Sequence, residues 1–544
     1  MSIGEQIARS VVRTIRGKRP FLVRNSLLRN GEKELLSCTN ADEFKWYTCG
    51  PTVYDDAHLG HARSYVSFDI IRRILTTCAG LRITYAMGVT DIDDKILTRA
   101  KERNECPRSL ARRYESRFFE DMDDLNVLSP NKILRVTEHI DELQSLIGEI
   151  VKSKKAYVTE KGNVYFSVES SGARYGQLDP SRMHSQQDSA MNADPEQDGF
   201  AAEKKDRRDF VLWKASDDST ATSGEWDSPW GSGRPGWHIE CSAMAMATMG
   251  RGLDLHTGGI DLRFPHHTNE LAVAEARLCS QNEALHESFR WSHTWLHGGH
   301  LHLKGRKMSK SVKNFITVRE FLQNGGSADA FRIFCLLHRY WTPVDYSDER
   351  LADAESYLSR VRSFLDRKVL TNSIQSGNET GRVHRMHPAC EHATQLEHSL
   401  RTMEDGIDEA IADDFDTSRV MGMISELVTR ANKSLNEDDS PKSGAAAVVH
   451  DMTQDYVRRT LSDLGLDVER FGKKRTEDAQ SGDAERFKDV MELLVSFRRS
   501  VRHGAREKDL KQVFAACDKA REEAQEKFGV RIMDGKQGKG WSET

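Results

Sequence analysis

His58-Leu59-Gly60-His61 and Lys307-Met308-Ser309-Lys310-Ser311 are the two stretches that decide the fold of this 544-residue chain. The first stands where an apolar strand (46–53) turns into an amphipathic helix (60–78), and its glycine lets the start of that helix approach the phosphates of ATP. The second places two lysines on a loop, where they can neutralise charge on departing pyrophosphate. Together, in this order, the two stretches predict an enzyme that cleaves ATP between its α and β phosphates.

Neither stretch is decisive alone. A His-x-Gly-His sequence also arises by chance or in small nucleotidyltransferases, and a basic loop with serine and methionine is more often a solvated turn. A second apolar strand, 83–89, ends in Thr90-Asp91, so these side chains emerge at the carboxyl edge of a parallel sheet, where ligands bind. The order of strand, turn and helix predicts an α/β protein with a Rossmann-like catalytic domain.

The composition excludes several classes of protein. With 38% hydrophobic and 30% charged residues and no apolar run of membrane-spanning length, we expect no membrane partner. Nine cysteines without a CxxC pair favour a reducing compartment over a disulfide framework. A net charge of −5 argues against a globally basic nucleic-acid binder, although a local basic track would suffice for RNA.

The chain is too long for a single hydrophobic core. We expect the catalytic domain over residues 21–345, interrupted by a connective insertion at about 128–225 whose polar second half forms a loop. Few strand signals follow residue 345, so we expect an α-helical bundle over 346–470. Residues 471–544 then form a C-terminal helical region that ends in a flexible tail.

The first twenty residues are basic. Five of them are Arg or Lys against the single acid Glu5, and apolar residues are interleaved at helical spacing. This pattern predicts a mitochondrial transit peptide over residues 1–20 and a place in the mitochondrial matrix. The alternative is a short basic tail on a cytoplasmic protein, because the segment is not rich in serine and retains its glutamate.

Further blocks of sequence resemble the cysteinyl-tRNA synthetases, a family of class I aminoacyl-tRNA synthetases, and its animal mitochondrial members most of all. The blocks are Trp46–Asp55, Val89–Lys95, Arg234–Met244, Leu255–Asp261 and Phe264–Glu270, and Gly299–Gly305 carries the likeness to the mitochondrial members. The resemblance is close from about residue 22 to about residue 345 and looser beyond. It implies the class I catalytic fold, followed by a helical bundle on the anticodon side of the tRNA.

The resemblance implies a zinc site made of Cys49, Cys241, His266 and Glu270. His266 and Glu270 stand four residues apart, so one face of a helix would present both, and thiolates from two distant strands would complete a tetrahedron. Spacing alone could not have paired the two cysteines. A zinc ion binds a thiolate far better than an alcohol, and it would therefore separate cysteine from serine where an apolar pocket cannot.

The family also supplies expectations for the two small substrates. Four groups would surround L-cysteine: the backbone of Gly50, the hydroxyl of Thr90, the ring of Trp237 and the imidazole of His266. Four catalytic residues would act on ATP and its Mg²⁺: His58, His61, Lys307 and Lys310. Gly258 and Gly259 would let the backbone approach the adenosine of ATP, and Asp261 would fix that loop, with a structural salt bridge as the alternative role of Asp261. Thr268 stands where the family usually carries glutamate, and we expect this difference to tune the site rather than abolish it.

The implied reaction ligates L-cysteine to tRNA(Cys) in two steps through cysteinyl adenylate, and we expect the enzyme to be a monomer. Basic runs at 473–475, 498–502 and 508–511 are candidates for contacts with RNA phosphates. Two alternatives stay open. One is a cysteine ligase that acts on a non-tRNA amine, which should lack the long helical region after residue 345. The other is a catalytically inactive zinc-containing RNA-binding protein, which would not need both signature stretches intact.

Overall fold

A computed structural model of the chain describes all residues except 1–9, 29–30, 41, 184–202, 217–223, 282–289, 310–313, 368–390, 438–443, 467–489, several positions between 491 and 507, 529, 533–540 and 544. The chain divides into two compact units, Met1–Glu469 and Arg470–Thr544. In the second unit, helix α15 (Leu510–Phe528) is followed by an antiparallel pair, β17 (Val530–Ile532) and β18 (Trp541–Glu543). Of the basic runs noted above, residues 473–475 lie outside the described part. Among described helices, none combines the length and apolar character needed to cross a membrane.

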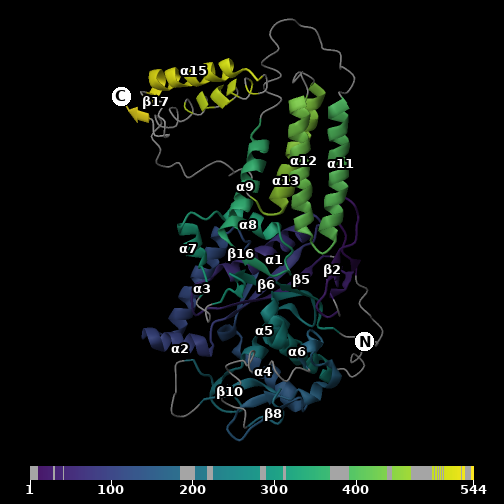
Figure 1. The fold of residues 1–544 in the computed structure, drawn as a ribbon. Coiled ribbons are helices and arrows are strands. Elements are labelled where there is room, and N and C mark those ends of the chain that lie inside the picture. The colour runs from purple at the N-terminus through teal and green to yellow at the C-terminus, as the bar shows by residue number, and fades with distance from the viewer. Residues whose placement is uncertain are drawn as a thin grey trace. The chain divides into compact units, whose positions relative to one another are not determined.

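A five-stranded parallel sheet forms the centre of the first unit (Figure 1). Its strands run in the order β13 (Ser292–Gly298), β12 (Leu253–Gly259), β5 (Phe44–Thr52), β6 (Ile83–Thr90) and β7 (Lys132–Arg135). Helix α1 (Leu59–Thr77) follows β5, while α2 (Asp94–Arg103) and α3 (Pro107–Asp124) follow β6. Parallel order with intervening helices is the predicted Rossmann-like arrangement, which places the chain's ligand-binding edge at the carboxyl ends of these strands.

The core of the first unit lies where helices cover this sheet. The inner strands are buried along most of their length, as strands covered on both faces are. Helix α5 (Trp237–Met249) packs on β5 and β6, and α4 (Ile140–Lys152) and α6 (Thr268–Gln281) pack on α5. Tyr47 and Ala86 of the sheet share one apolar cluster with Ile239 and Met244 of α5. The cluster fixes α5 against the carboxyl ends of the strands.

The connective insertion is present, but its predicted limits are wrong. Its centre is an antiparallel sheet in the order β11 (Gly233–Pro235), β10 (Phe210–Ala215), β9 (Val164–Phe166) and β8 (Ala156–Val158). β7 lies within the predicted range 128–225 and yet pairs with β6 in the central sheet, whereas β11 belongs to the insertion and lies beyond that range. Strands of three or four residues with charged neighbours give too weak a pattern to place these boundaries.

Residues 10–20 pack into the fold of the first unit, so removal of a transit peptide that extends to residue 20 would take part of this fold away. β1 (Ser10–Val11) pairs with β4 (Ser37–Cys38), and β2 (Leu22–Arg24) pairs with β3 (Lys33–Leu35). Val12 and Thr14 are buried, and the backbone N–H of Ile15 donates to the carbonyl of Cys78 at 2.7 Å. Of the apolar residues that suggested an amphipathic helix, Val12 is buried, whereas Ile15 is 63% exposed. Residues 1–9 lie outside the described part.

A helical bundle follows the sheet within the same compact unit. Its long helices are α9 (Asp348–Leu365), α11 (Glu391–Ala412), α12 (Thr417–Glu437) and α13 (Gly444–Asp463), and Figure 1 shows α11, α12 and α13 side by side. Between the sheet and the bundle lie α7 (Val318–Gln323), α8 (Ala328–Leu336) and the small sheet β15 (Arg306–Lys307), β14 (Leu301–Leu303) and β16 (Val344–Tyr346). The helical region predicted after residue 345 is therefore confirmed.

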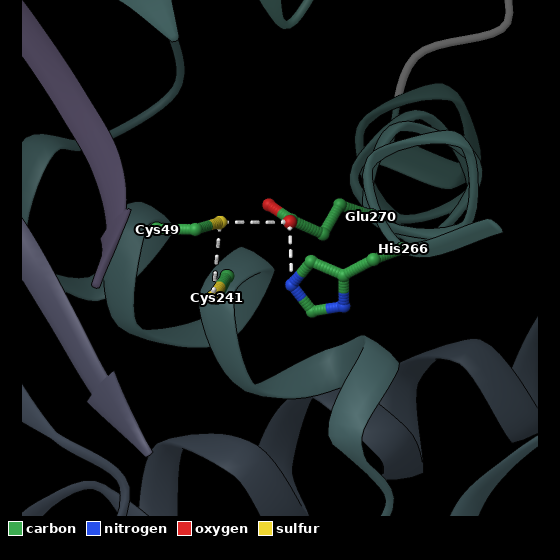
Figure 2. A group of neighbouring side chains, drawn as sticks. All are labelled: Cys49, Cys241, His266 and Glu270. Carbon is green, nitrogen blue, oxygen red and sulfur yellow. Dashed lines mark hydrogen bonds and ion pairs between the residues drawn. The ribbon is translucent and has the colours of Figure 1, made fainter. Parts of the chain in front are cut away.

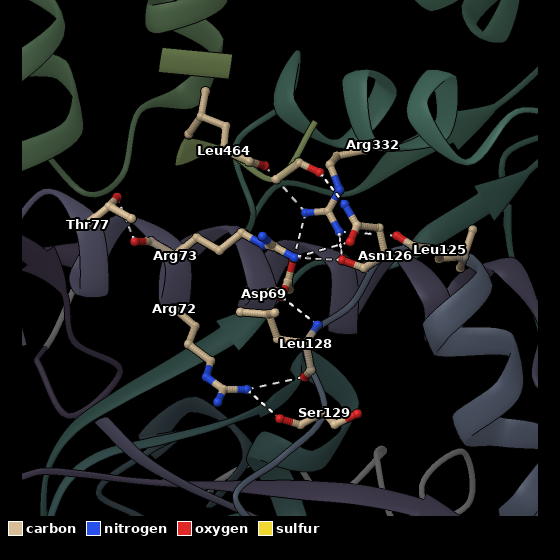
Figure 3. A network of polar contacts seen from close by, with 11 residues as sticks. Asp69, Arg72, Arg73, Thr77, Leu125, Asn126, Leu128, Ser129, Arg332 and Leu464 are labelled. Carbon is tan, nitrogen blue, oxygen red and sulfur yellow. Dashed lines mark hydrogen bonds and ion pairs between the residues drawn. The ribbon is translucent and has the colours of Figure 1, made fainter. Parts of the chain in front are cut away.

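A buried ion pair joins α1, α8 and the end of α13 (Figure 3). Arg332 lies 2.7 Å from Asp69, and both side chains are only 1% exposed. Arg332 also donates to the carbonyls of Leu125, Asn126 and Leu464, at 3.1, 2.7 and 3.4 Å. This single side chain therefore links the catalytic fold to the bundle.

Candidate active site and metal centre

A hollow of about 510 Å³ opens at the carboxyl ends of β5, β6 and β12. Twelve residues predicted from the sequence line it: Cys49, Gly50, His58, His61, Thr90, Trp237, Cys241, Gly258, Gly259, Asp261, His266 and Lys307. Glu270 is not in the lining but contacts His266 and Cys49 from behind. Lys310 lies outside the described residues. The fold thus gathers at one sheet edge residues that are more than 250 positions apart in the sequence.

Four side chains in this hollow can hold one metal ion (Figure 2). Their donor atoms, two sulfurs, one imidazole nitrogen and one carboxylate oxygen, all lie within 4.8 Å of one another. The Cys49 sulfur is 3.5 Å from that of Cys241 and 3.2 Å from a carboxylate oxygen of Glu270. The His266 Nε2 lies 2.9 Å from the same oxygen. This is the donor set and nearly the spacing of a tetrahedral zinc site.

The local structure that presents these donors differs in part from expectation. Cys49 comes from strand β5, but Cys241 comes from helix α5 rather than from a second strand. His266 lies in the short turn η7 (Arg263–His267) directly before α6, and Glu270 lies in the first turn of α6. The spacing of four residues still brings the two side chains together. An apolar run such as Trp237–Met249 does not reveal from periodicity alone whether it is strand or helix.

The electrostatics of the cluster favour a cation. Burial opposes ionisation of Glu270, but His256 and His266 outweigh it and hold the pKa of Glu270 well below its usual value. A hydrogen bond from Cys49, aided by His266, lowers the pKa of Cys241 to about 6. Burial, the hydrogen bond to Cys241 and the nearby negative charges raise the pKa of the Cys49 thiol. Two anionic donors therefore surround one buried position, which is the electrostatic condition for metal binding.

His256 was missed by the sequence reasoning. It lies on β12, is fully buried, and its Nε2 is 2.9 Å from Oε2 of Glu270, the oxygen that does not face His266. Its ring stacks on Trp295 with 4.1 Å between centroids. Such a contact fixes the orientation of a ligating carboxylate. No local signal in the sequence identified this contact, because strand periodicity does not name the partner of a buried histidine.

The predicted cysteine pocket is built around Trp237 and Thr90. The Trp237 ring stacks on His266 with centroids 4.2 Å apart. The Thr90 hydroxyl donates to Oε2 of buried Glu240 at 2.9 Å, so its oxygen remains an acceptor for an ammonium group. Gly50 needs to be glycine, since a Cβ there would lie 2.2 Å from the Gly88 carbonyl. Thr268, the departure from the family, is buried and donates to the Arg263 carbonyl at 2.8 Å, which ties it to the turn before α6.

The two histidines of the first signature stretch form the start of α1. His58 is the N-cap and its side chain accepts from the backbone N–H of His61, whose side chain in turn accepts from the N–H of His58. Their rings are stacked with 3.7 Å between centroids. A side chain on Gly60 would meet the His58 ring at 2.8 Å. The first turn of α1 therefore presents two imidazoles and the helix N-terminus to the hollow, as phosphate binding requires.

Lys307 reaches the same hollow from the opposite wall. Its Nζ lies 3.3 Å from Asp261, and although burial opposes ionisation, Lys307 and His300 lower the pKa of that carboxyl group. The amide of Asn314 holds the loop from its far end, donating to the Lys307 carbonyl at 3.0 Å and accepting from the Ser309 N–H at 3.1 Å. The lysine that would meet pyrophosphate is thus held at the site by a carboxylate.

The tRNA synthetases class I (C) catalytic domain family matches residues 35–356. This chain belongs to the cysteinyl-tRNA synthetases. A Xenopus tropicalis protein named "Probable cysteine--tRNA ligase, mitochondrial" is 42% identical over 491 residues, which cover 89% of this chain and 78% of the relative. A Dictyostelium discoideum protein of the same name is 35% identical over 94% of this chain and 86% of its own length. Its cytoplasmic counterpart, "Cysteine--tRNA ligase, cytoplasmic", is 34% identical over 95% of this chain and 77% of its own length.

Solved structures show the fold of this cysteinyl-tRNA synthetase. Methionyl-tRNA synthetase of Mycobacterium tuberculosis bound to methionyl-adenylate aligns over 79% of this chain and 93% of its own, with a TM-score of 0.57 and 16% identity. A putative arginyl-tRNA synthetase of Campylobacter jejuni aligns with a TM-score of 0.54 and 13% identity, over 78% of this chain and 93% of its own. At these identities the likeness supports the class I architecture only.

Proposed function

We propose that the chain ligates L-cysteine to tRNA(Cys) through cysteinyl adenylate, and that a zinc ion selects the cysteine thiolate. One observation carries the proposal: Cys49, Cys241 and His266 line the same hollow as His58 and His61. A set of thiol-binding donors therefore lies beside a phosphate-binding helix start. Relatives from Xenopus, Dictyostelium and Pyrococcus bear the name cysteine–tRNA ligase, which supports the same reaction.

The donor set fits zinc, because two thiolates, one imidazole and one carboxylate oxygen suit a borderline-soft ion in tetrahedral geometry. When bound, zinc supplies a Lewis acid that stabilises the thiolate of the substrate. The chain does the rest of the selection: His256 fixes Glu270, and Trp237 stacks on His266 beside the space for the amino acid. An apolar pocket alone would separate cysteine from serine by only ~1–3 kcal/mol.

In the first step, the carboxylate of L-cysteine attacks the α-phosphate of ATP and pyrophosphate leaves. His58 and His61 hold the phosphates at the start of α1 and stabilise the charge that develops on them. Lys307 moves from Asp261 to the departing pyrophosphate, where Lys310 and the Mg²⁺ that accompanies ATP add positive charge. Gly258 and Gly259 border the space for adenosine, and Thr90 accepts from the ammonium group of the amino acid. Catalysis is therefore mainly positioning and charge stabilisation.

In the second step, a hydroxyl of the terminal ribose of tRNA(Cys) attacks the cysteinyl carbonyl and AMP leaves. The bundle from α9 to α13 lies on the anticodon side of the bound tRNA, and the enzyme acts as a monomer. The long helical region favours a tRNA substrate over a small amine acceptor.

Two assays on the full-length protein test the proposal. Pyrophosphate exchange into ATP should require L-cysteine and should not respond to L-serine at the same concentration, and tRNA(Cys) should be charged with cysteine. Exchange without tRNA charging would favour the ligase that acts on another amine. Binding of tRNA without exchange would favour the inactive RNA-binding protein. The variant Cys335→Ala, which removes a buried thiol of α8 outside the hollow, serves as the control for loss of a cysteine.

We further propose that the enzyme works in the mitochondrial matrix. The basic N-terminus and two relatives named mitochondrial support this compartment, while a third relative is named cytoplasmic. A fluorescent fusion of the full chain should enter mitochondria, and one that lacks residues 1–9 should enter less. Cytoplasmic fluorescence from both fusions would contradict the proposal.

A further inference from the structure

The lysine loop ends where its backbone pairs with the first signature stretch. His58 and Thr317 form an antiparallel bridge between the two segments. We call residues 57–59 and 316–318 the seam, and the bridge lies at its centre. The seam sets the end of the lysine loop directly against a histidine that we expect to hold the phosphates of ATP. Two N–H···O=C bonds flank the bridge, from Leu59 to Ile316 at 2.9 Å and from Val318 to Ala57 at 3.0 Å.

The seam is connected to catalytic groups on both of its sides. One segment contains His58, which lines the active-site hollow. On the other segment, Asn314 stands two residues before the seam and donates to the carbonyl of Lys307, which lines the same hollow. A displacement of the seam would therefore move both groups. Misplacement of a catalytic group by ~1 Å can cost about a hundredfold in rate.

Helix α3 anchors the two segments of the seam (Figure 1). Arg319, in the first turn of α7, directly follows the seam, and its guanidinium group lies 2.9 Å from Asp121 and 2.6 Å from Glu120 of α3. One turn earlier on α3, Arg117 lies 3.0 Å from Asp56, the residue directly before the seam. One rigid helix thus fixes both chain segments that carry the two signature stretches.

Arg319 makes the more buried of these two anchors. The Asp121 side chain is 1% exposed, whereas that of Asp56 is 27% exposed. Within the described ranges, Arg319 is the only basic side chain that forms an ion pair with Asp121. Loss of a partner is costly for a buried carboxylate and nearly neutral for an exposed one, so the Arg319 contact should dominate. Arg319 does not line the active-site hollow and would act only through the seam.

We propose that Arg319 is a positioning residue for adenylation. It ties the end of the lysine loop to α3 and thereby sets the place of Lys307 relative to His58. The inference rests on the proposed function, because it assigns a role in the first step of that reaction. Since Arg319 touches neither the metal ligands nor the predicted cysteine pocket, its loss should slow the chemical step without weakening the binding of cysteine.

Three variants of the full chain test the proposal. Arg319→Met removes the charge and keeps most of the stem, whereas Arg319→Lys keeps a cation that can reach one of the two acids. Arg113→Met is the matched control. It removes an equally exposed arginine of α3, 38% against 36%, from an ion pair with Glu105 that lies apart from the seam. A melting curve for each variant first establishes that it is folded.

The first readout is cysteine-dependent pyrophosphate exchange into ATP. Arg319→Met should lower its kcat about tenfold or more and leave the KM for cysteine nearly unchanged, because the catalytic groups are displaced and the amino-acid pocket is not. Arg319→Lys should recover part of the rate, and Arg113→Met should match the wild type. An unchanged kcat in Arg319→Met, or an equal loss in Arg113→Met, would overturn the proposal.

A double variant tests whether Arg319 acts through the loop. If it positions Lys307, then Arg319→Met should cost less in a Lys307→Ala background than in the wild type, because the group that it positions is already gone. A double variant whose rate falls by the full product of the two single effects would show that Arg319 acts independently of this lysine, against the proposal.

Amide hydrogen exchange provides a readout that needs no activity. The N–H groups of Leu59 and Val318 form the seam, so peptides that contain them should exchange hydrogen faster in Arg319→Met than in the wild type or in Arg113→Met. Unchanged protection of both peptides in Arg319→Met would overturn the proposal. If the wild-type protein shows no cysteine-dependent pyrophosphate exchange, the proposed function fails, while the protection of these amides still decides whether Arg319 holds the seam.

Discussion

Replacing Arg332 by methionine should destabilise the first compact unit more than almost any other single change outside the metal centre. Methionine approximates the length of the arginine stem, so the substitution mainly removes charge and donors. Asp69 would lose its 2.7 Å partner and keep Arg73 at 2.8 Å and the N–H of Leu128 at 2.9 Å. Three buried or half-buried carbonyls, those of Leu125, Asn126 and Leu464, would lose a donor.

The size of the effect follows from these contacts. Removing one partner of a buried ion pair costs ~3–5 kcal/mol, because the remaining charge stays buried. Arg73 is 16% exposed and still neutralises Asp69 in part. The cost of leaving this carboxylate without Arg332 should therefore lie near the lower end of that range, at ~3 kcal/mol. The Asn126 carbonyl keeps Arg73 as a donor at 2.9 Å, so only the longer bonds to the carbonyls of Leu125 and Leu464 add to the loss, by at most ~1 kcal/mol each. We therefore expect a loss of about 3–5 kcal/mol in the free energy of unfolding.

Urea denaturation followed by tryptophan fluorescence measures this loss. Eight of the nine tryptophans precede Arg470, so the signal reports mainly the first unit. Asp69→Asn keeps the shape of the carboxylate and should destabilise by a similar amount, since it leaves Arg332 buried without a counter-charge. The double variant should be less unstable than the sum of the two single variants. A loss below about 1 kcal/mol in both single variants would refute the view that this pair joins the catalytic fold to the bundle.

Four further predictions concern the metal, the lysines, the N-terminus and pH. Cys49→Ser, Cys241→Ser and His266→Ala should each lower bound zinc and abolish cysteine-dependent exchange, while Cys335→Ala retains both; full zinc content in two of the three would contradict the metal assignment. Lys307→Ala and Lys310→Ala should each slow adenylation about a hundredfold with little change in the KM for cysteine, because the lysines act on charge that appears in the transition state. A chain that starts at Phe21 should melt at a lower temperature than one that starts at Ser10, because only the former loses β1 and buried Val12; equal melting temperatures would show that residues 10–20 do not stabilise the fold. Burial raises the pKa of Asp121 to about 6. Between about pH 4 and pH 6 the folded protein therefore keeps a proton on Asp121 that the unfolded chain has already released. The free energy of unfolding should decrease as the pH rises through this range. Asp121→Asn should remove that part of the decline, and identical pH profiles of unfolding for wild type and variant would exclude it.

The sequence predicted those parts of the fold whose pattern is local. Strands β5 and β6 and helix α1 have apolar runs of sufficient length and end in recognisable turns, and the structure confirms them. Short strands were misplaced: β7 and β11 gave too few residues to reveal a period, and the boundaries of the insertion were wrong for that reason. The pattern over residues 10–20 did not reveal strand β1, because Val11, Val12 and Ile15 fit a helix and an extended chain almost equally well.

The candidate metal centre required information that no local pattern holds. Cys49 and Cys241 are 192 residues apart, and only the closed fold shows that their sulfurs lie 3.5 Å from each other. The resemblance to a family supplied the pairing, whereas periodicity could not even assign Cys241 to a helix. His256 was missed as a partner of Glu270 because a buried polar residue acquires its role from what packs against it. Its position in a strand gave no hint of that contact.

Helix α1 explains why the catalytic fold and the bundle belong to one compact unit. Its first turn carries His58 and His61, and Asp69 follows eleven residues after His58, which is about 16 Å along the axis. Asp69 is held by Arg332, which also bonds the carbonyl of Leu464 just beyond α13. The histidines at one end and the bundle at the other are therefore fixed to the same rigid element. A boundary at residue 345 divides the secondary-structure pattern, but it cuts through the packing that positions His58 and His61. The second compact unit of the chain begins instead at Arg470.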